Sequence, residues 1–211
     1  MDLFIIIPIL FFSIVLHEFA HGYVAYRLGD DTAYLLGRLT LNPLKHIDPI
    51  GTIAVPALCL WSGLPVFGWA KPVPINGNRL PSPRKDMGKV GLAGPLANLT
   101  LALLCALCMK IVVSGILVAP ESATKTIQFF IYGIQINVLL AVFNLIPILP
   151  LDGGHIVAAL LPLKASLYYT RFLGRYGMWV VLGLILTGLF RHILYPPMYL
   201  IITIISKIFG L

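Results

Sequence analysis

Long apolar runs are the feature that most constrains the fold of this chain. Residues 3–26, 91–113 and 127–150 are each apolar and long enough to cross a bilayer, which takes about 20 residues of helix. Over the whole chain, 59% of the residues are hydrophobic and only 11% are charged, whereas soluble domains carry about 25% charged residues. Because so little polar surface is available to cover a soluble core, the sequence predicts an all-α polytopic membrane protein.

The C-terminal part of the chain leaves the number of spans open. Two short apolar runs are separated there by Arg191 and His192, so they form either two short spans or one interrupted hairpin. The expected total is about 4–6 transmembrane segments. We expect one membrane-embedded domain over residues 1–211, with a core at 1–160 and accessory segments at about 174–209.

Basic residues bear on the sidedness of the spans. Residues 50–68 are apolar but interrupted by Pro56, Gly63 and Pro65, so this segment either crosses the membrane or re-enters it from one side. A full crossing would move the five basic residues of 71–89 away from the other basic loops, so the positive-inside rule favours re-entry, with the N-terminus outside. The net charge of +7 then indicates attraction to the lipid bilayer. No basic arm interleaved with aromatic residues occurs, so no nucleic-acid partner is expected.

Three ionisable side chains interrupt the first apolar run. His17, Glu18 and His21 lie within FSIVLHEFAHGYVAY, although ionisable groups cost roughly 2.5–3.5 kcal/mol each in a membrane helix and therefore usually mark function. His17 and His21 share one helix face and can bind one cation, while Glu18 lies beside them as a candidate base for activating water. This HExxH arrangement predicts a catalytic metal site. A structural metal is the alternative, although such sites usually have four ligands and are closed.

The third metal ligand must come from another segment, because a catalytic zinc takes three protein ligands and keeps one position open. Asp152 is the best candidate, since it is a carboxylate in an apolar setting that follows helix-breaking prolines. His155 competes with it for this role. We interpret His46 as a loop histidine at the membrane surface and His192 as an interfacial one.

The polar features of separate segments are expected to converge at one depth. His17 lies roughly 22 Å along the first span, near the cytoplasmic side, and the third long run returns to the same side before Asp152. GPLAN, at residues 94–98, opens the second long run from that side too. Asn98 and Asn144 serve either helix packing or substrate binding; the sequence leaves both roles open.

Several motifs together resemble one known family. HEFAH, GPLAN and NLIPILPLDGGH, in this order between about residues 12 and 160, are similar to the site-2 protease family of intramembrane zinc metalloproteases (peptidase M50), as are NPLKHIDPIGT and FGWAKPVPIN. The resemblance implies that His17, His21 and Asp152 bind one catalytic Zn²⁺ and that Glu18 is the general base. It also implies that Asn144 helps to hold substrate or the oxyanion. Residues 68–76 resemble a β-like element that pairs with an unwound substrate, and the PDZ or CBS domains of other members are not expected here.

The function implied by this resemblance is hydrolysis of peptide bonds within or near transmembrane helices. The expected partner is a single-span membrane protein or peptide, and the expected location is a prokaryotic inner membrane with the active site toward the cytoplasm. The oligomeric state does not follow from the sequence. Two rival readings are a zinc-binding membrane transporter, which would need polar residues at several depths, and a catalytically inactive scaffold, which would not need Glu18.

Overall fold

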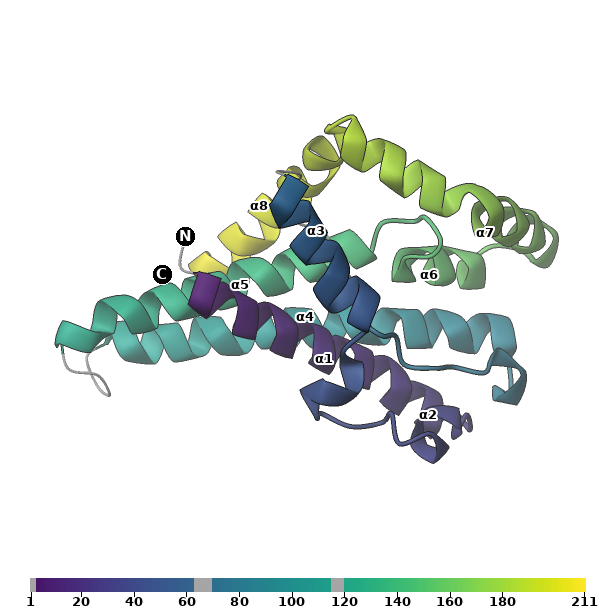
Figure 1. Cartoon of the computed structure of the whole chain (residues 1–211), viewed down its shortest axis with the longest axis horizontal. Helices are drawn as coiled ribbons and strands as arrows, with labels where there is room; N and C mark the ends of the chain where they lie inside the picture. The colour runs from purple at the N-terminus through teal and green to yellow at the C-terminus, as the bar shows by residue number, and fades with distance from the viewer. Residues whose placement is uncertain (1–2, 63–69, 115–119) are drawn as a thin grey trace.

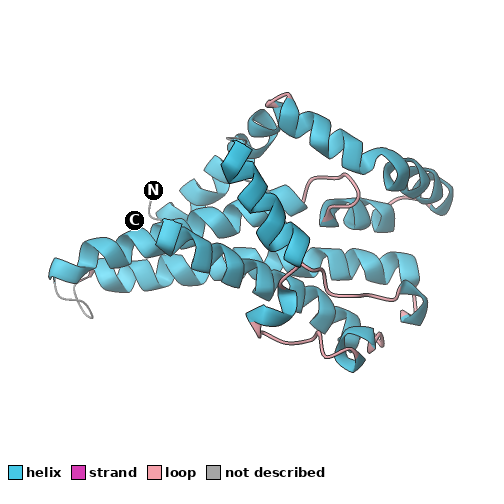
Figure 2. Cartoon of the chain, viewed as in Figure 1, coloured by secondary structure: helices cyan, strands magenta, loops and turns pink. Residues whose placement is uncertain are grey.

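The structure is a computed structural model that describes residues 3–62, 70–114 and 120–211. These residues form helices joined by loops, and no strand occurs among them (Figure 2). Within the described residues, four helices contain a segment long and apolar enough to cross a membrane: α1 (Leu3–Arg27), α4 (Pro83–Val113), α5 (Pro120–Asn144) and α8 (Leu189–Phe209). The other elements are α2 (Thr32–Leu35), η1 (Pro43–His46), η2 (Pro49–Ala54), α3 (Val55–Ser62), η3 (Gly77–Arg79), α6 (Asp152–Leu160) and α7 (Leu163–Leu186). The predicted all-α polytopic membrane fold is confirmed.

Helix α4 is the centre of the bundle. It packs against α5, α1 and α6, and Figure 1 shows α4 and α5 running along each other while α1 crosses them. Small residues permit this packing: Ala102 and Ala106 are fully buried, and a Cβ on Gly133 would lie 2.7 Å from Cys105 Sγ. Helices in a membrane associate through such close backbone approach, because lipid is as apolar as the helix surfaces themselves.

Glycines also bring α6 against α4. A Cβ on Gly91 would lie 3.0 Å from the carbonyl oxygen of Asp152, and a Cβ on Gly88 only 2.4 Å from Ala159 Cβ. Gly153 packs equally closely against the end of α5, where an added Cβ would meet the carbonyl oxygen of Leu145 at 2.2 Å. The first turn of α6, which begins at Asp152, is therefore held directly against the bundle.

Helix α7 supports the loop between α5 and α6. The hydroxyl of Tyr169 donates to the carbonyl of Pro147 at 2.8 Å, and Gly177 lies so close to Leu149 that an added Cβ would overlap its carbonyl oxygen. The break between α7 and α8 falls at Gly188, whose φ of 72° suits glycine. The expected separation at Arg191 and His192 was wrong, since both residues lie inside α8.

The connection between α1 and α4 is only partly described. Residues 49–62 form η2 and α3, but 63–69 lie outside the described residues, so re-entry of the 50–68 segment stays a prediction. Of the expected β-like element at 68–76, the described residues 70–76 have no regular secondary structure. Their backbone is anchored by Asp30, whose Oδ2 accepts from the N–H of Asn76 at 2.6 Å.

His46 lies in the connection between α1 and α4, as expected for a loop histidine. Its side chain is fully buried, with Nε2 2.8 Å from the carbonyl oxygen of Thr40. Its own carbonyl accepts from the N–H of Lys71 at 2.9 Å. His46 therefore joins two parts of the connection, and its expected place at the membrane surface stays a prediction.

Candidate metal centre

Three side chains from two helices meet at one point. His17 and His21 lie one turn apart on α1, and Asp152 begins α6. The Nε2 atoms of the two histidines are 3.0 Å apart, and they lie 3.2 Å and 3.3 Å from the carboxylate oxygens of Asp152. Among the described residues, this is the cluster of histidine, cysteine and carboxylate side chains whose ligand atoms all lie within 4.8 Å of one another.

The other ring nitrogen of each histidine sets its tautomer. Nδ1 of His17 lies 2.6 Å from Oδ1 of Asn98, and Nδ1 of His21 lies 2.7 Å from the carbonyl oxygen of Val90. A carbonyl oxygen only accepts hydrogen bonds, so both Nδ1 atoms donate. In the neutral imidazole, each Nε2 then presents a lone pair toward the other histidine and toward Asp152.

The residues at this point fit a bound cation. Oδ2 of Asp152 is buried and, among the described residues, receives no hydrogen bond. Gly94 leaves space beside the imidazoles, because a Cβ there would lie 2.5 Å from His21 Nε2 and 2.6 Å from His17 Nε2. Three convergent lone-pair donors repel one another unless a positive charge lies between them. Two imidazole nitrogens and one carboxylate oxygen are a typical ligand set for catalytic zinc.

His155 lines the same pocket but lies outside the cluster of ligand atoms. Burial lowers the pKa of the His155 imidazole by more than the nearby Asp152 carboxylate raises it, so this side chain is neutral at pH 7. Of the two candidates for third ligand, the structure brings Asp152 and not His155 to the histidines.

Glu18 and Asn144 line a pocket of about 220 Å³ together with the three clustered residues. Oε2 of Glu18 accepts from the N–H of Val73 at 2.8 Å, so the 70–76 loop forms one wall of this pocket. Nδ2 of Asn144 donates to the carbonyl of Leu140 at 3.0 Å within α5. Both residues are thus at the pocket, as the sequence led us to expect.

Asn98 lies behind the pocket. Its side chain is fully buried and contacts His17, the carbonyl of Ser13 and Asn137. A role in direct contact with substrate does not fit this position. Asn137 was not among the residues predicted from the sequence, although an asparagine inside the apolar IQINVLL stretch is as costly in lipid as Asn144.

Comparison with known proteins identifies relatives across most of the chain. A family model described as peptidase family M50 matches residues 109–184. YwhC of Bacillus subtilis is 42% identical over 185 residues, covering 87% of this chain and 81% of YwhC. Rip2 of Mycolicibacterium smegmatis is 34% identical, covering 67% of this chain and 51% of Rip2. The protein named zinc metalloprotease MJ0392 of Methanocaldococcus jannaschii is 27% identical, covering 86% of this chain and 42% of that protein.

No solved structure matches this chain. The Bacillus relative is nonetheless sufficient to establish the family, because its identity to this chain extends over most of both proteins. The chain therefore belongs to peptidase family M50, the site-2 protease family that its sequence motifs resemble, and zinc is the cofactor of that family.

Proposed function

We propose that this protein is an intramembrane zinc metalloprotease that hydrolyses peptide bonds within or near transmembrane helices. His17, His21 and Asp152 hold the zinc ion, and Glu18 is the general base. The observation that carries the proposal is the convergence of three ligand atoms within 4.8 Å at a pocket that Glu18 also lines. Membership of peptidase family M50 supports the same chemistry.

The proposed location of the site accounts for the substrate class. The HExxH motif lies in the C-terminal half of α1, a helix apolar enough to span a membrane, which supports a pocket at membrane depth where a transmembrane segment can reach it. A transmembrane helix satisfies its own backbone hydrogen bonds, so it must unwind locally before a carbonyl becomes available. We propose a single-span protein as the substrate, an inner membrane of a prokaryote as the location, and a site facing the cytoplasm with the N-terminus outside.

Each residue at the site has a separate role in the proposed reaction. When bound, zinc supplies Lewis-acid polarisation and makes water easier to deprotonate near neutral pH. The N–H of Val73 holds one carboxylate oxygen of Glu18, and the other oxygen takes the proton of the attacking water and later delivers it to the leaving amine. Asn144, at the same pocket, positions the substrate carbonyl.

Replacing Glu18 with Gln tests this function. The variant keeps the shape of the side chain and all three proposed ligands but loses the base. We expect purified wild type and Glu18→Gln to bind zinc alike in detergent, and only the wild type to cleave a model transmembrane substrate reconstituted with it. Cleavage by Glu18→Gln at the wild-type rate would contradict the role of Glu18, and absence of zinc from both proteins would contradict the metal site. A zinc transporter or an inactive scaffold would show zinc in both proteins and cleavage by neither.

A further inference from the structure

A chain of buried amides leads from the metal centre into the middle of the bundle. Asn98 on α4 joins His17 to Asn137 on α5, since Nδ2 of Asn98 lies 2.9 Å from Oδ1 of Asn137. Asn137 in turn donates from Nδ2 to the carbonyl of Gly133 at 2.8 Å. Both asparagine side chains are fully buried.

The carbonyl of Gly133, at the end of this chain of amides, determines the direction of each hydrogen bond between them. The carbonyl of Gly133 only accepts, so the atom of Asn137 facing it is the NH₂ group, and the oxygen of Asn137 faces Asn98. Asn98 must therefore turn its NH₂ group toward Asn137 and its oxygen toward His17. An oxygen at that place accepts the proton of Nδ1 and leaves Nε2 of His17 free to bind a metal.

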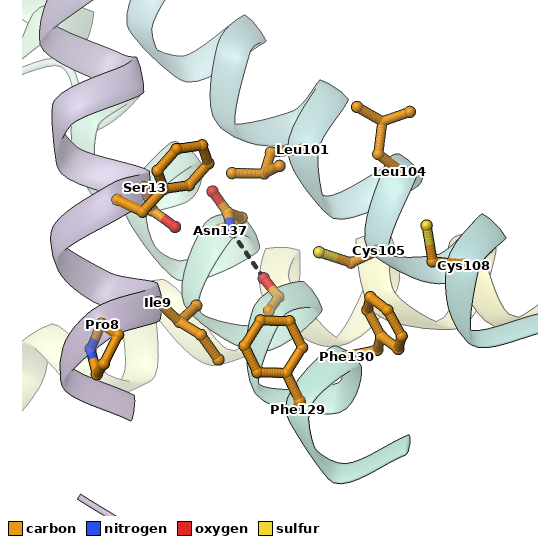
Figure 3. A pocket seen from close by; sticks show the side chains of 12 residues that line it. Pro8, Ile9, Ser13, Leu101, Leu104, Cys105, Cys108, Phe129, Phe130 and Asn137 are labelled. Carbon is orange, nitrogen blue, oxygen red and sulfur yellow. Dashed lines mark hydrogen bonds between the residues drawn. The ribbon is translucent and has the colours of Figure 1, made fainter. Parts of the chain in front are cut away.

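The surroundings of Asn137 are mainly apolar. Asn137 lies at the wall of a second cavity, of about 410 Å³, which Figure 3 shows to be lined mainly by apolar side chains such as Ile9, Leu101 and Phe130. The dashed line there marks the bond to Gly133. Without Asn137, only the longer 3.3 Å contact with the carbonyl of Ser13 holds the NH₂ group of Asn98 in place, so the preference for this orientation of the amide is weakened. The turned amide presents a donor to His17 and favours the tautomer with a proton on Nε2.

We propose that Asn137 is a positioning residue that, through Asn98, holds His17 in the tautomer that binds zinc. The inference rests on the proposed role of His17 as a zinc ligand. We call the hydrogen-bonded chain of His17, Asn98 and Asn137 the relay. His21 does not depend on it, because the backbone carbonyl of Val90 sets the tautomer of His21. The relay thus makes one of the two histidines depend on side chains from two other helices.

Zinc affinity of the purified protein, measured by competition with a chelator, tests the relay. We expect Asn137→Leu to bind zinc about 10–100-fold more weakly than wild type, the range for loss of such an outer contact. Ser13→Ala is the matched control, because Ser13 is also fully buried beside Asn98 and its hydroxyl has no partner among the described residues. The control is expected to bind zinc as wild type does.

A second variant separates the tautomer from simple packing. Asn98→Asp has an acceptor oxygen at both positions, so it presents an acceptor to His17 whichever way it turns, and Asn137 is no longer needed. We expect Asn98→Asp combined with Asn137→Leu to regain the zinc affinity that Asn137→Leu loses. In the metal-free protein, ¹⁵N spectra of labelled histidine should show His17 protonated on Nδ1 in wild type and in the double variant, and on Nε2 in Asn137→Leu.

Each outcome decides between the alternatives. Reduced affinity in Asn137→Leu that the double variant recovers, together with the change of tautomer, supports the relay. Wild-type zinc affinity in a folded Asn137→Leu variant overturns the relay. The relay is also overturned if the double variant shows His17 in the wild-type tautomer and still binds zinc as weakly as Asn137→Leu. If wild type itself binds no zinc, the proposed metal site fails, and the relay fails with it.

Discussion

Replacing Gly94 with Ala is the perturbation whose effect on the metal centre follows most directly from the geometry. The added Cβ would lie 2.5 Å from Cε1 of His17 and from Nε2 of His21, and 2.6 Å from Nε2 of His17. Ordinary van der Waals contact begins near 3.4 Å. The two rings must therefore move by about 1 Å, because the α4 backbone is held in the centre of the bundle.

A displacement of this size is large compared with the tolerance of a metal site. Metal–ligand distances are held to about ±0.2 Å, so a shift of about 1 Å in two of the three ligands removes the site. We expect Gly94→Ala to lower zinc affinity by at least about 100-fold, equivalent to about 2.8 kcal/mol at 1.4 kcal/mol per factor of ten. Proteolytic activity should fall by at least the same factor.

The assay is chelator competition for zinc on purified protein, with the unfolding temperature measured on the same samples. Gly183→Ala is the matched control, because Gly183 lies in α7 with nothing within 4 Å of its added Cβ. The control should bind zinc normally and be slightly more stable, by about 0.4–1 kcal/mol, since alanine restricts the unfolded chain. Wild-type zinc affinity in Gly94→Ala would refute the assignment of this space to the metal.

The Asp30 anchor and the metal itself each allow a further test. Burial raises the pKa of Asp30, but hydrogen bonds from Thr32 and Asn76 outweigh it and lower the pKa. The carboxylate therefore stabilises the fold above its unfolded pKa of about 3.9, and this contribution is lost as pH falls through the lower folded value. Asp30→Ala should lower the free energy of unfolding by about 1–3 kcal/mol at neutral pH. A loss of stability that persists unchanged in acid would contradict this reasoning. Removing zinc with a chelator should cost wild type about 2.7 kcal/mol of stability if zinc was present at about 100 times its dissociation constant. The same chelator should leave the unfolding temperature of Asp152→Ala unchanged.

The metal centre shows which residues of a site are visible in a sequence. His17 and His21 follow from helical periodicity alone, since residues four apart share a face. Asp152 follows from a carboxylate in an apolar setting, although this reasoning left His155 as a competitor until the structure placed it outside the ligand cluster. Asn137 could be recognised from the sequence only as a polar residue in an apolar stretch, because nothing local connects it with a histidine 120 positions away on another helix.

The fold, too, has parts that can be predicted from the sequence and parts that cannot. Three long apolar runs correspond to α1, α4 and α5, because a hydrophobic segment of that length needs no tertiary information to be recognised as a span. The expected separation at Arg191 and His192 was wrong, because the chain turns at Gly188, where φ is 72°, and both residues lie inside α8. Arg191 lies on the surface of α8 with its guanidinium over the ring of Tyr195, so the helix continues through it.

The amino-acid sequence by itself determined the class of fold, the HExxH pair and the polar groups in apolar segments, because hydropathy and helical periodicity are local properties. Only the tertiary structure decided that Asp152 meets the histidines, that Gly94 leaves space beside them, and that Asn98 supports His17 from behind. These relations depend on how closely α1, α4 and α6 approach one another. That approach is set by glycines on facing surfaces, whose contacts are distant in the sequence.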